Sequence, residues 1–473
     1  MARRHLVYVL PGIGGSVLER PGTGKRSGEA VWDAGLVDVA GLLTRPDRLS
    51  VDQPLRPTGV IRSRRLLPGW TVVPGYERLI DALGALPDVR LDKGNPDRRD
   101  QAANVVVFPY DFRLGVAHTA ALLAADVHER LKDLSESERA GRVVVLAHSM
   151  GGLVARYWLG PLMGWPLCRA LITLGTPHRG APKALQLLAN GVQLAGVRLD
   201  GVSDLLRTWP SVAELLPRFP AIWDTVAEAP RYPHELSVPG LGTAAKAGFD
   251  LHQDIEAGWR TIPRGPDAPQ VVPRLGWSHD TPASAKWDGN RLTIHKAPPH
   301  WLDLDGWQHD HGDGTVPAFS AVPLELGGHN TFGWRARDRH GPMAASSWVP
   351  DLVEAYERRA PLTAVQGEVR HASLGLDLDE LHLAGLPVPV RVRVRGDVPG
   401  SGEPAAVWAL LRQPDEPRAR TAEVKLEWDP ADRCYGADLP GQRPGLYDLK
   451  VTARAVPGAG DLTVTDTVAV VTQ

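Results

Sequence analysis

The sequence predicts an α/β domain followed by an all-β sandwich. Short apolar runs bounded by turn residues alternate with helical segments over residues 1–362, which is typical of a parallel sheet covered by helices on both faces. Over residues 366–473 apolar and polar residues alternate with period two between Gly- and Pro-rich turns, which is typical of a β-sandwich. A length of 473 residues also exceeds what one hydrophobic core usually holds.

Apolar runs mark the expected strands of the parallel sheet: HLVYVL (5–10), NVVVFPY (104–110), RVVVLAH (142–148), ALITLG (170–175) and QVVPRLG (270–276). They are rich in Val, Ile and Leu, as strands buried on both faces are. Residues 118–138 have an amphipathic pattern and are expected to be a helix between two of these strands. Residues 350–362 are expected to be the last helix of the domain.

Residues 186–300 interrupt this alternation and are expected to form an inserted cap. Tryptophan is enriched near this segment, at positions 209, 223, 259, 277, 287, 301 and 307 of a chain that holds 15 in all. The enrichment fits an insertion with a small core of its own, or a cap whose aromatic side chains line an apolar substrate pocket.

The C-terminal region is expected to hold about seven short strands. Its alternating segments are residues 387–397, 405–411, 420–429, 445–455 and 461–471. The stretch RPGLYDLKV is similar to the tyrosine corner of immunoglobulin-like domains, with Tyr447 as the corner residue. Since no chemistry is evident in this region, we expect it to bind a protein or glycan partner, of unknown identity, or to act as a scaffold.

The composition excludes several functional classes. A net charge of −2 leaves no basic field for nucleic acid. Two cysteines far apart, Cys168 and Cys434, argue against a disulfide framework and fit a reducing compartment. The N-terminal apolar run spans about five residues, against ~7–15 in a secretory signal, and no run reaches the ~18 of a membrane span. We therefore expect a cytoplasmic protein, and a peripheral contact with a membrane stays open.

The glycine run LPGIGGS (10–16) does not predict a nucleotide cofactor. Its third small position is Val17, and residues 19–30 are too rich in Gly and Pro to form the crossover helix. The stretch GTGKRS (22–27) is no phosphate loop either. Glu19 stands where such a loop has its first Gly, and Arg26 stands where it has Ser or Thr. No cofactor is expected, and these glycines need another explanation.

The stretch RVVVLAHSMGGLVARYWLG (142–160) predicts a nucleophile elbow. A strand leads into Ser149 and a helix follows, with small residues at the crowded positions, Ala147 and Gly151. This turn raises the serine hydroxyl onto the tip of the strand, at the N-terminus of a helix. The elbow predicts the α/β-hydrolase fold, with Ser149 as the nucleophile.

The base and acid of a triad follow the serine in the chain order of this fold. Asp313, in GDGTVP (312–317), is the expected acid. His340, in RDRHGPM, is the preferred base because loop and final helix follow it, and His329, in GGHNTF, is the alternative. His148 is expected to point away from the nucleophile and to have a structural role.

A competing interpretation of QHDHGDG (308–314) is a metal site formed by His309, Asp310, His311 and Asp313. Ligands so close in one loop seldom converge on one ion without help from elsewhere, and no second cluster is evident, so we expect no metal. The N-terminal glycines are instead expected to form part of an oxyanion hole. In serine hydrolases of this fold, a loop after an early strand donates one N–H group and the residue after the nucleophile, here Met150, donates the other.

Six ordered motifs resemble one family: LPGIGGSVLE, FPYDFR (108–113), AHSMGG, LGTPHRGAPKAL (174–185), TWPSVAELLP (208–217) and GDGTVP. The chain is similar in them to the lecithin:cholesterol acyltransferase-like family of α/β-hydrolases, which includes phospholipid:diacylglycerol acyltransferases and group XV phospholipase A2. The resemblance implies Ser149 as nucleophile, Asp313 as acid, His340 as base, and the Ile13 and Met150 amides as oxyanion donors.

The resemblance also implies a lipid or acyl-ester substrate and an acyl-serine intermediate, with water or an alcohol as the acyl acceptor. It does not extend to the C-terminal sandwich, and the chain shows neither the secretory leader nor the disulfides of eukaryotic members, so their lipid specificity is not carried over. Two alternatives stay open. One is a small-ester esterase, thioesterase or lactonase of the same fold, and the other is a catalytically silent binding protein. In FPYDFR, Asp111 and Arg113 are expected to form a supporting ion pair.

Overall fold

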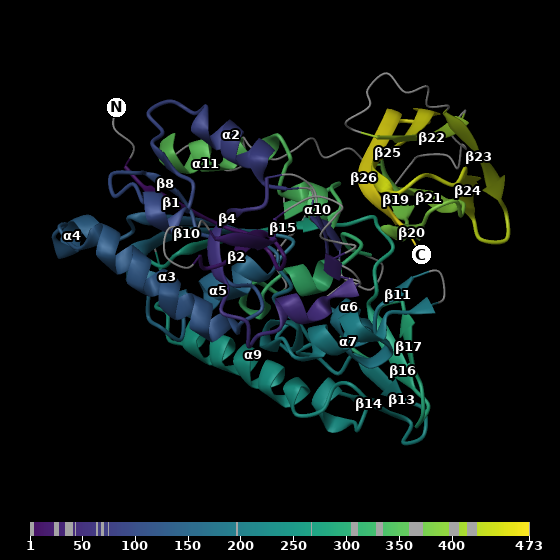
Figure 1. Ribbon diagram of the computed structural model, residues 1–473, viewed down its shortest axis with the longest axis horizontal. Coiled ribbons are helices and arrows are strands. Elements are labelled where there is room, and N and C mark those ends of the chain that lie inside the picture. The colour runs from purple at the N-terminus through teal and green to yellow at the C-terminus, as the bar shows by residue number, and fades with distance from the viewer. Residues whose placement is uncertain are drawn as a thin grey trace.

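A computed structural model of the chain describes residues 4–22, 28–33, 41–42, 44–62, 65–67, 71–73, 75–194, 197–265, 267–303, 311–327, 334–358, 372–396, 406–413 and 423–472. An α/β domain and a β-sandwich lie beside each other (Figure 1), and most of the buried hydrophobic residues of each form a separate cluster. The expected domain boundary, between residues 362 and 366, lies outside the described residues.

The central sheet has seven strands in the order β18-β15-β10-β9-β1-β8-β7, and all neighbouring strands are parallel. Their bounds are β1 (Leu6–Leu10), β7 (Leu91–Asp92), β8 (Val105–Val107), β9 (Val143–His148), β10 (Cys168–Leu174), β15 (Gln270–Gly276) and β18 (Arg335–Ala336). The five expected strands are confirmed as β1, β8, β9, β10 and β15. Because β9 and β10 lie in the middle of the sheet, nearly all of their residues are buried.

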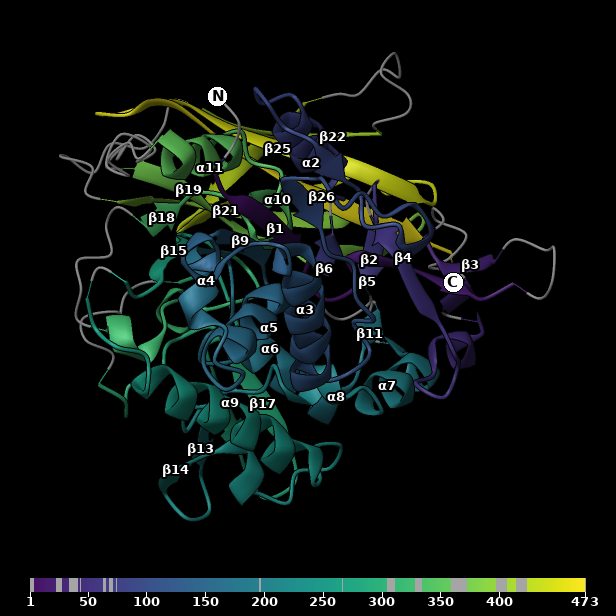
Figure 2. The ribbon, with the colours of Figure 1, turned by 90° about the vertical axis from the view of Figure 1, so that its left-hand side faces the viewer.

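Helices cover both faces of the sheet. Helices α2 (Glu77–Gly84) and α11 (Trp348–Arg358) lie on one face, and α3 (Val116–Leu131) and α5 (Met150–Leu159) lie on the other (Figures 1 and 2). The single helix expected at residues 118–138 is two helices, α3 and the short α4 (Glu136–Arg139). The break has a local cause, since Ser135 and Glu138 form a capping box that starts a new helix.

Short elements flank the sheet before and after the nucleophile. The N-terminal ones are β2 (Ser16–Arg20), β3 (Glu29–Trp32), β4 (Arg56–Val60), β5 (Arg65–Leu67) and β6 (Thr71–Val73). After β10 come α6 (Pro182–Leu185), β11 (Gln193–Leu194), β12 (Val197–Arg198), α7 (Asp200–Arg207), α8 (Pro210–Ala213), β13 (Ile222–Asp224), β14 (Ala229–Arg231), α9 (Ala244–Arg260), β16 (Ser284–Trp287) and β17 (Leu292–His295). Helix α10 (His340–Met343) precedes α11.

The expected cap, residues 186–300, is divided into two parts. Strand β15 falls within this range but belongs to the central sheet, so the chain leaves the cap and returns to it. The two parts rejoin because β13 pairs in parallel with β16, in a small sheet of order β14-β13-β16-β17. This sheet and α9 lie at the bottom of the molecule in Figure 1.

Several cap tryptophans pack into the body of the protein. Trp209 is 1% exposed and its indole N–H donates to the Leu49 carbonyl oxygen. The Trp259 indole donates to the Arg156 carbonyl oxygen, and the Arg156 guanidinium lies over its ring. Trp223 packs against Trp301 with 5.3 Å between ring centroids. These contacts join the cap to the body of the protein, and most of the buried hydrophobic residues of the described cap belong to the same hydrophobic cluster as the central sheet, so a separate cap core is not observed there. Trp307 lies outside the described residues.

The sandwich has eight described strands where about seven were expected, in the order β19-β21-β24-β23-β22-β25-β26-β20. Their bounds are β19 (Ala372–Asp377), β20 (Leu381–Leu383), β21 (Val388–Gly396), β22 (Ala406–Arg412), β23 (Val424–Asp429), β24 (Cys434–Leu439), β25 (Gly445–Val456) and β26 (Gly460–Val471). The tyrosine corner is confirmed, because the Tyr447 hydroxyl donates to the Arg443 carbonyl oxygen at 2.9 Å. The expected α/β-hydrolase fold with a C-terminal sandwich is likewise confirmed.

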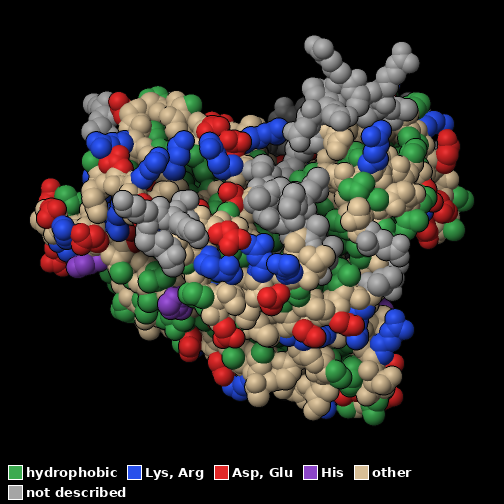
Figure 3. All heavy atoms as spheres, in the orientation of Figure 1, with side chains coloured by type: hydrophobic (Ala, Val, Ile, Leu, Met, Phe, Trp, Pro, Cys, Tyr) green, Lys and Arg blue, Asp and Glu red, His purple; other side chains and the backbone are tan. Residues whose placement is uncertain are grey.

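Acidic and basic side chains are interspersed over the face drawn in Figure 3, in keeping with the small net charge of the chain. Among the described helices, none combines the length and apolar character that crossing a bilayer requires.

We expect Ile172→Ala to lower the free energy of unfolding of the α/β domain by about 2–5 kcal/mol, because it leaves a cavity in the centre of the sheet. Ile172 is fully buried in β10, opposite Leu146 of β9 and Val272 of β15. Chemical denaturation measures the change. Leu122→Ala on α3 is the control, since Leu122 is 50% exposed and its loss should change stability by no more than about 0.5 kcal/mol.

Candidate active site

The predicted site residues meet at the carboxyl ends of the central strands. Ser149 follows β9, His340 follows β18, and the loop that holds Ile13 follows β1. In parallel sheets this edge is where ligands bind, because loops from several strands converge there. Asp313 reaches the same edge through the segment after β15, where His279 forms β-bridges with Gly312 and Asp313.

Ser149 forms the sharp turn between β9 and α5. Its backbone has φ 53° and ψ −127°, a conformation that non-glycine residues rarely adopt. Neighbouring loops hold the turn in place: the Ser149 N–H donates to the Leu174 carbonyl oxygen, and the Thr176 hydroxyl donates to the Ser149 carbonyl oxygen at 2.9 Å. The geometry is that of the predicted nucleophile elbow.

The Ser149 hydroxyl, the His340 imidazole and the Asp313 carboxylate form one hydrogen-bonded chain. His340 Nε2 lies 2.9 Å from Ser149 Oγ, and His340 Nδ1 lies 2.7 Å from Asp313 Oδ2. All three side chains are about 1% exposed. An ionised carboxylate can only accept, so Nδ1 carries the proton and Nε2 is left to accept the serine proton.

The turn after Asp313 keeps this carboxylate ionised. Its other oxygen, Oδ1, accepts the backbone N–H groups of Thr315 and Val316 at 2.9 and 2.7 Å. Burial opposes ionisation, but the charge and hydrogen bond of His340, together with these two N–H groups, outweigh it and lower the pKa of Asp313. The base is attached to the same turn, because the backbone N–H of His340 donates to the backbone carbonyl oxygen of Asp313.

Among the histidines that the structure describes, it is His340 whose ring nitrogen lies within hydrogen-bond distance of the Ser149 hydroxyl. The alternative base, His329, lies outside the described residues, as do His309 and Asp310 of the metal interpretation. Asp313 is bound to His340, and His311 lies 3.8 Å from Asp280. Within the part of the chain that the structure describes, no group of three or more His, Cys, Asp or Glu side chains is placed to hold a metal ion.

The loop after β1 has most of its backbone polar groups engaged. The Gly12 N–H donates to the Tyr76 hydroxyl, and the Gly12 carbonyl accepts the Gly15 N–H. Three more loop carbonyls are engaged: Pro11 accepts the Tyr110 hydroxyl, Gly14 accepts the Trp32 indole, and Gly15 accepts the Ile61 N–H. In the described residues the Ile13 and Met150 N–H groups have no hydrogen-bond acceptor. They remain available to an oxyanion, as the sequence predicts.

The approach of this loop to the nucleophile explains its first glycine. A Cβ atom on Gly12 would lie 2.8 Å from the Ser149 Cβ atom, too close for any side chain to fit without movement. Only glycine therefore lets the oxyanion loop come this near to the serine.

His148 joins the oxyanion loop to the loop of the base. Its Nε2–H donates to the His340 carbonyl oxygen at 2.9 Å, so its Nδ1 accepts the Tyr76 hydroxyl at 2.8 Å. Tyr76 in turn accepts the Gly12 N–H. Burial, and to a smaller extent the nearby His340, lower the pKa of His148 to about 3, so that this bridge is neutral. The structural role expected for His148 is therefore to connect Tyr76, which contacts the oxyanion loop, to the backbone of His340.

The predicted ion pair between Asp111 and Arg113 is present at 2.7 Å, with both side chains buried. Arg113 also donates to the Ser50 and Gln53 carbonyl oxygens and so ties down the segment before β4. Tyr76, Tyr110 and Trp32 were missed by the sequence analysis. Tyr110 lies within the FPYDFR motif, but nothing in that motif indicates its contact with the loop after β1. Tyr76 and Trp32 lie far from the nucleophile in sequence, and no motif marks them.

The family model described as lecithin:cholesterol acyltransferase matches residues 98–240. The resemblance to this family is confirmed. The matched segment includes Ser149 and the cap residues up to β14, whereas Asp313 and His340 lie beyond it. Similarity to the lecithin:cholesterol acyltransferase family supports acyl-ester hydrolysis or acyl transfer in general.

Two kinds of solved structure are similar to parts of the chain. Superoxide reductase (neelaredoxin) from Ignicoccus hospitalis is 17% identical, covering 22% of this chain and 89% of its own, with a TM-score of 0.18. Bacillus licheniformis lipase BlEst2 in its propeptide form is 11% identical, covering 75% of this chain and 84% of its own, with a TM-score of 0.27. Both TM-scores are too low to bear on fold or activity. No curated protein sequence gives a significant match.

Buried neutral histidines should make the protein less stable as the pH falls below neutrality. Burial is the main cause that lowers the pKa of His148 and His279 to about 3. As the pH falls from about 6.5 to 5, the unfolded chain binds protons at these positions and the folded chain does not. For each histidine the free energy of unfolding therefore falls by about 0.7 kcal/mol per pH unit near pH 6.5 and by about 1.4 kcal/mol per pH unit near pH 5.

Denaturant titrations at several pH values between 5 and 7 measure this slope, and His279→Gln should reduce it by the share of one histidine. An unchanged slope in His279→Gln would contradict the assignment of a neutral, buried His279.

Proposed function

We propose that the protein is a serine-dependent acyl-ester hydrolase or O-acyltransferase that works through an acyl-serine intermediate. The observation that supports this most directly is the hydrogen-bonded chain from Ser149 through His340 to Asp313. Its order and polarity are those of a charge-stabilised nucleophile and base. The match to the lecithin:cholesterol acyltransferase family supports the same class of reaction.

In the first half-reaction the Ser149 oxygen attacks the carbonyl carbon of an ester while its proton passes to His340 Nε2. Asp313 stabilises the resulting imidazolium through Nδ1–H. The tetrahedral oxyanion accepts hydrogen bonds from the Ile13 and Met150 N–H groups. The carbon–oxygen bond to the leaving alcohol then breaks, the alcohol takes the proton from His340, and the acyl group remains on Ser149.

In the second half-reaction water or an alcohol attacks the acyl-serine while His340 accepts its proton. Collapse of the second oxyanion breaks the bond to Ser149, whose oxygen regains the proton. The acceptor decides between hydrolysis and acyl transfer. We infer a lipid or other long-chain acyl ester as the substrate class, because the family match covers the nucleophile and about the first half of the cap. The cytoplasmic location expected from the sequence stays a prediction.

Covalent labelling tests the mechanism directly. A fluorophosphonate should react with Ser149, forming an oxygen–phosphorus bond and releasing fluoride, and Ser149→Ala should abolish labelling. Ser137→Ala, at an exposed serine of α4, is the matched control and should label like the unmodified protein. Labelling that persists in Ser149→Ala would contradict the assignment.

Hydrolysis of p-nitrophenyl esters should fall by about 10⁴-fold or more in Ser149→Ala and in His340→Ala, the scale expected when a triad member is removed. Thermal unfolding of each variant shows whether it is folded.

Acyl chains of increasing length on the same leaving group test the substrate class. A rise in kcat/KM with chain length supports the lipid proposal. A preference for short chains would favour a small-ester esterase, thioesterase or lactonase.

A further inference from the structure

Arg339, the residue before the base, contacts both loops of the triad. It is 3% exposed, and its guanidinium lies against Gly314, the residue after Asp313. Gly314 has φ +91°, and a Cβ atom there would lie 2.8 Å from Arg339 Nη2. The Arg339 guanidinium thus fills the space that a side chain at position 314, in the turn after Asp313, would need. The backbone of Arg339 continues directly into His340.

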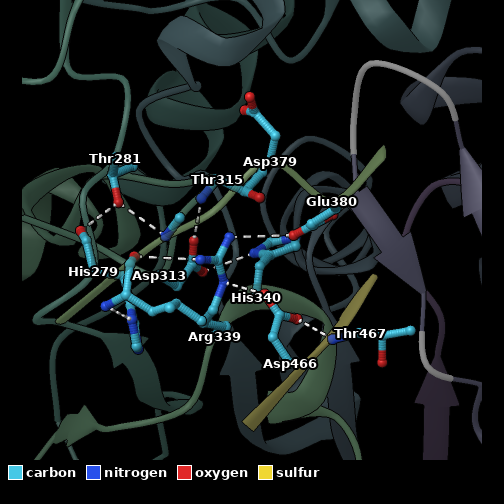
Figure 4. A network of polar contacts seen from close by, with 12 residues as sticks. His279, Thr281, Asp313, Thr315, Arg339, His340, Asp379, Glu380, Asp466 and Thr467 are labelled. Carbon is cyan, nitrogen blue, oxygen red and sulfur yellow. Dashed lines mark hydrogen bonds and ion pairs between the residues drawn. The ribbon is translucent and has the colours of Figure 1, made fainter. Parts of the chain in front are cut away.

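Carboxylates of the C-terminal sandwich hold this guanidinium. Arg339 Nε lies 2.6 Å from Asp466 Oδ2 of β26, and Nη2 lies 3.4 Å from Glu380 Oε1, which precedes β20. Nη1 donates to the Leu376 carbonyl oxygen of β19. Figure 4 shows Asp466, Glu380 and Arg339 grouped around the Asp313–His340 pair.

We propose that Arg339 is a positioning residue for the Asp313–His340 pair, and that Asp466 and Glu380 of the sandwich hold Arg339 in its working position. The inference rests on the proposed function, because it concerns the same nucleophile and base. It gives the sandwich a part in catalysis without a residue that touches the substrate.

A second link runs through His279, which is fully buried. Its Nε2–H donates to the Arg337 carbonyl oxygen at 2.8 Å, and its Nδ1 accepts the Leu376 N–H of β19. Its carbonyl accepts the Thr281 hydroxyl, whose oxygen accepts the Gly314 N–H at 2.9 Å. Through His279 the sandwich is therefore linked to the same two loops. The links reach Gly314, one residue after Asp313, and Arg337, three residues before His340.

The charges around Arg339 also favour this role. Burial lowers its pKa, but Asp466, Glu380 and Asp313 outweigh burial and raise it, so the guanidinium stays charged. Burial and the nearby Glu380 raise the pKa of Asp466, whereas Arg339 and Lys183 of α6 oppose that shift. Removing the Asp466 and Glu380 carboxylates would leave a buried cation beside the turn after Asp313, with Asp313 and Asp377 among the anions that still act on it.

Ion pairs other than those of Arg339 also join the two domains. Asp280 pairs with Arg393 and Arg395 at 2.6 and 2.5 Å, and Lys296 pairs with Asp377 at 2.6 Å. A buried ion pair adds little stability compared with apolar contacts of the same shape. Attachment alone therefore does not account for a guanidinium placed between the acid and the base.

The test compares Asp466→Asn, Glu380→Gln and the double variant with Lys296→Gln, all in the full chain. Lys296→Gln is the matched control, because it removes the ion pair between the domains with Asp377 and Lys296 is not among the charges that act on Arg339. Three quantities are measured: kcat and KM for a p-nitrophenyl ester, the rate constant of inactivation by a fluorophosphonate, and the midpoint of thermal unfolding.

We expect kcat and the inactivation rate constant to fall together by about 10–100-fold in the Asp466 and Glu380 variants, as for a displaced catalytic group, while KM changes little. The control should match the unmodified protein. Unchanged rates in folded Asp466→Asn or Glu380→Gln, with or without a lower unfolding midpoint, would overturn the proposal. An unmodified protein that does not react with the fluorophosphonate would instead overturn the proposed function.

Discussion

The left-handed backbone of Ser149 is the constraint to which the rest of the active site is fitted. A residue in this conformation costs about 1–3 kcal/mol and persists only where its surroundings fix it. Here the surroundings are β9 and α5, the carbonyl of Leu174 and the hydroxyl of Thr176. The turn also sets how near the loop after β1 must come, and that nearness requires glycine at position 12.

Many of the polar groups around the triad are hydrogen-bonded, and two of those that are not bear on function. Tyr76 and His148 link the oxyanion loop to the carbonyl of His340, so the donors and the base share one neutral, buried bridge. Two N–H groups, on Ile13 and Met150, remain without an acceptor in the described residues. Buried donors are rarely left unpaired, and at an active site such donors are the groups that a developing negative charge can use.

Local pattern was enough to predict five of the seven sheet strands and the elbow, and to select Asp313 and His340, because each is marked by an apolar run, a turn or its place before the last helix. The two-residue edge strands β7 and β18 carry no such apolar run and were not predicted. Local pattern was not enough for Tyr76, Arg339 or His279, whose contacts join segments far apart in sequence. The expected helix at residues 118–138 failed at Ser135, where a capping box overrode the amphipathic pattern. The cap was expected as one insertion over residues 186–300, although residues 270–276 within it were also expected to be a strand of the central sheet. In the structure this strand, β15, divides the cap into two parts.

Strand β26 is synthesised after the other helices and strands that the structure describes. Its Asp466 nevertheless pairs with Arg339, the residue before the base His340. The strands of the parallel sheet and the residues of the elbow all precede α11 in the chain, so they are synthesised before the sandwich. If Arg339 positions His340 as proposed, a nascent chain without the sandwich would have Ser149 in its elbow while His340 is not yet held in its catalytic position. Activity would then begin only after β26 has been synthesised and has docked on the α/β domain. Ser149 would therefore stay unreactive during translation and in truncated chains that lack β26.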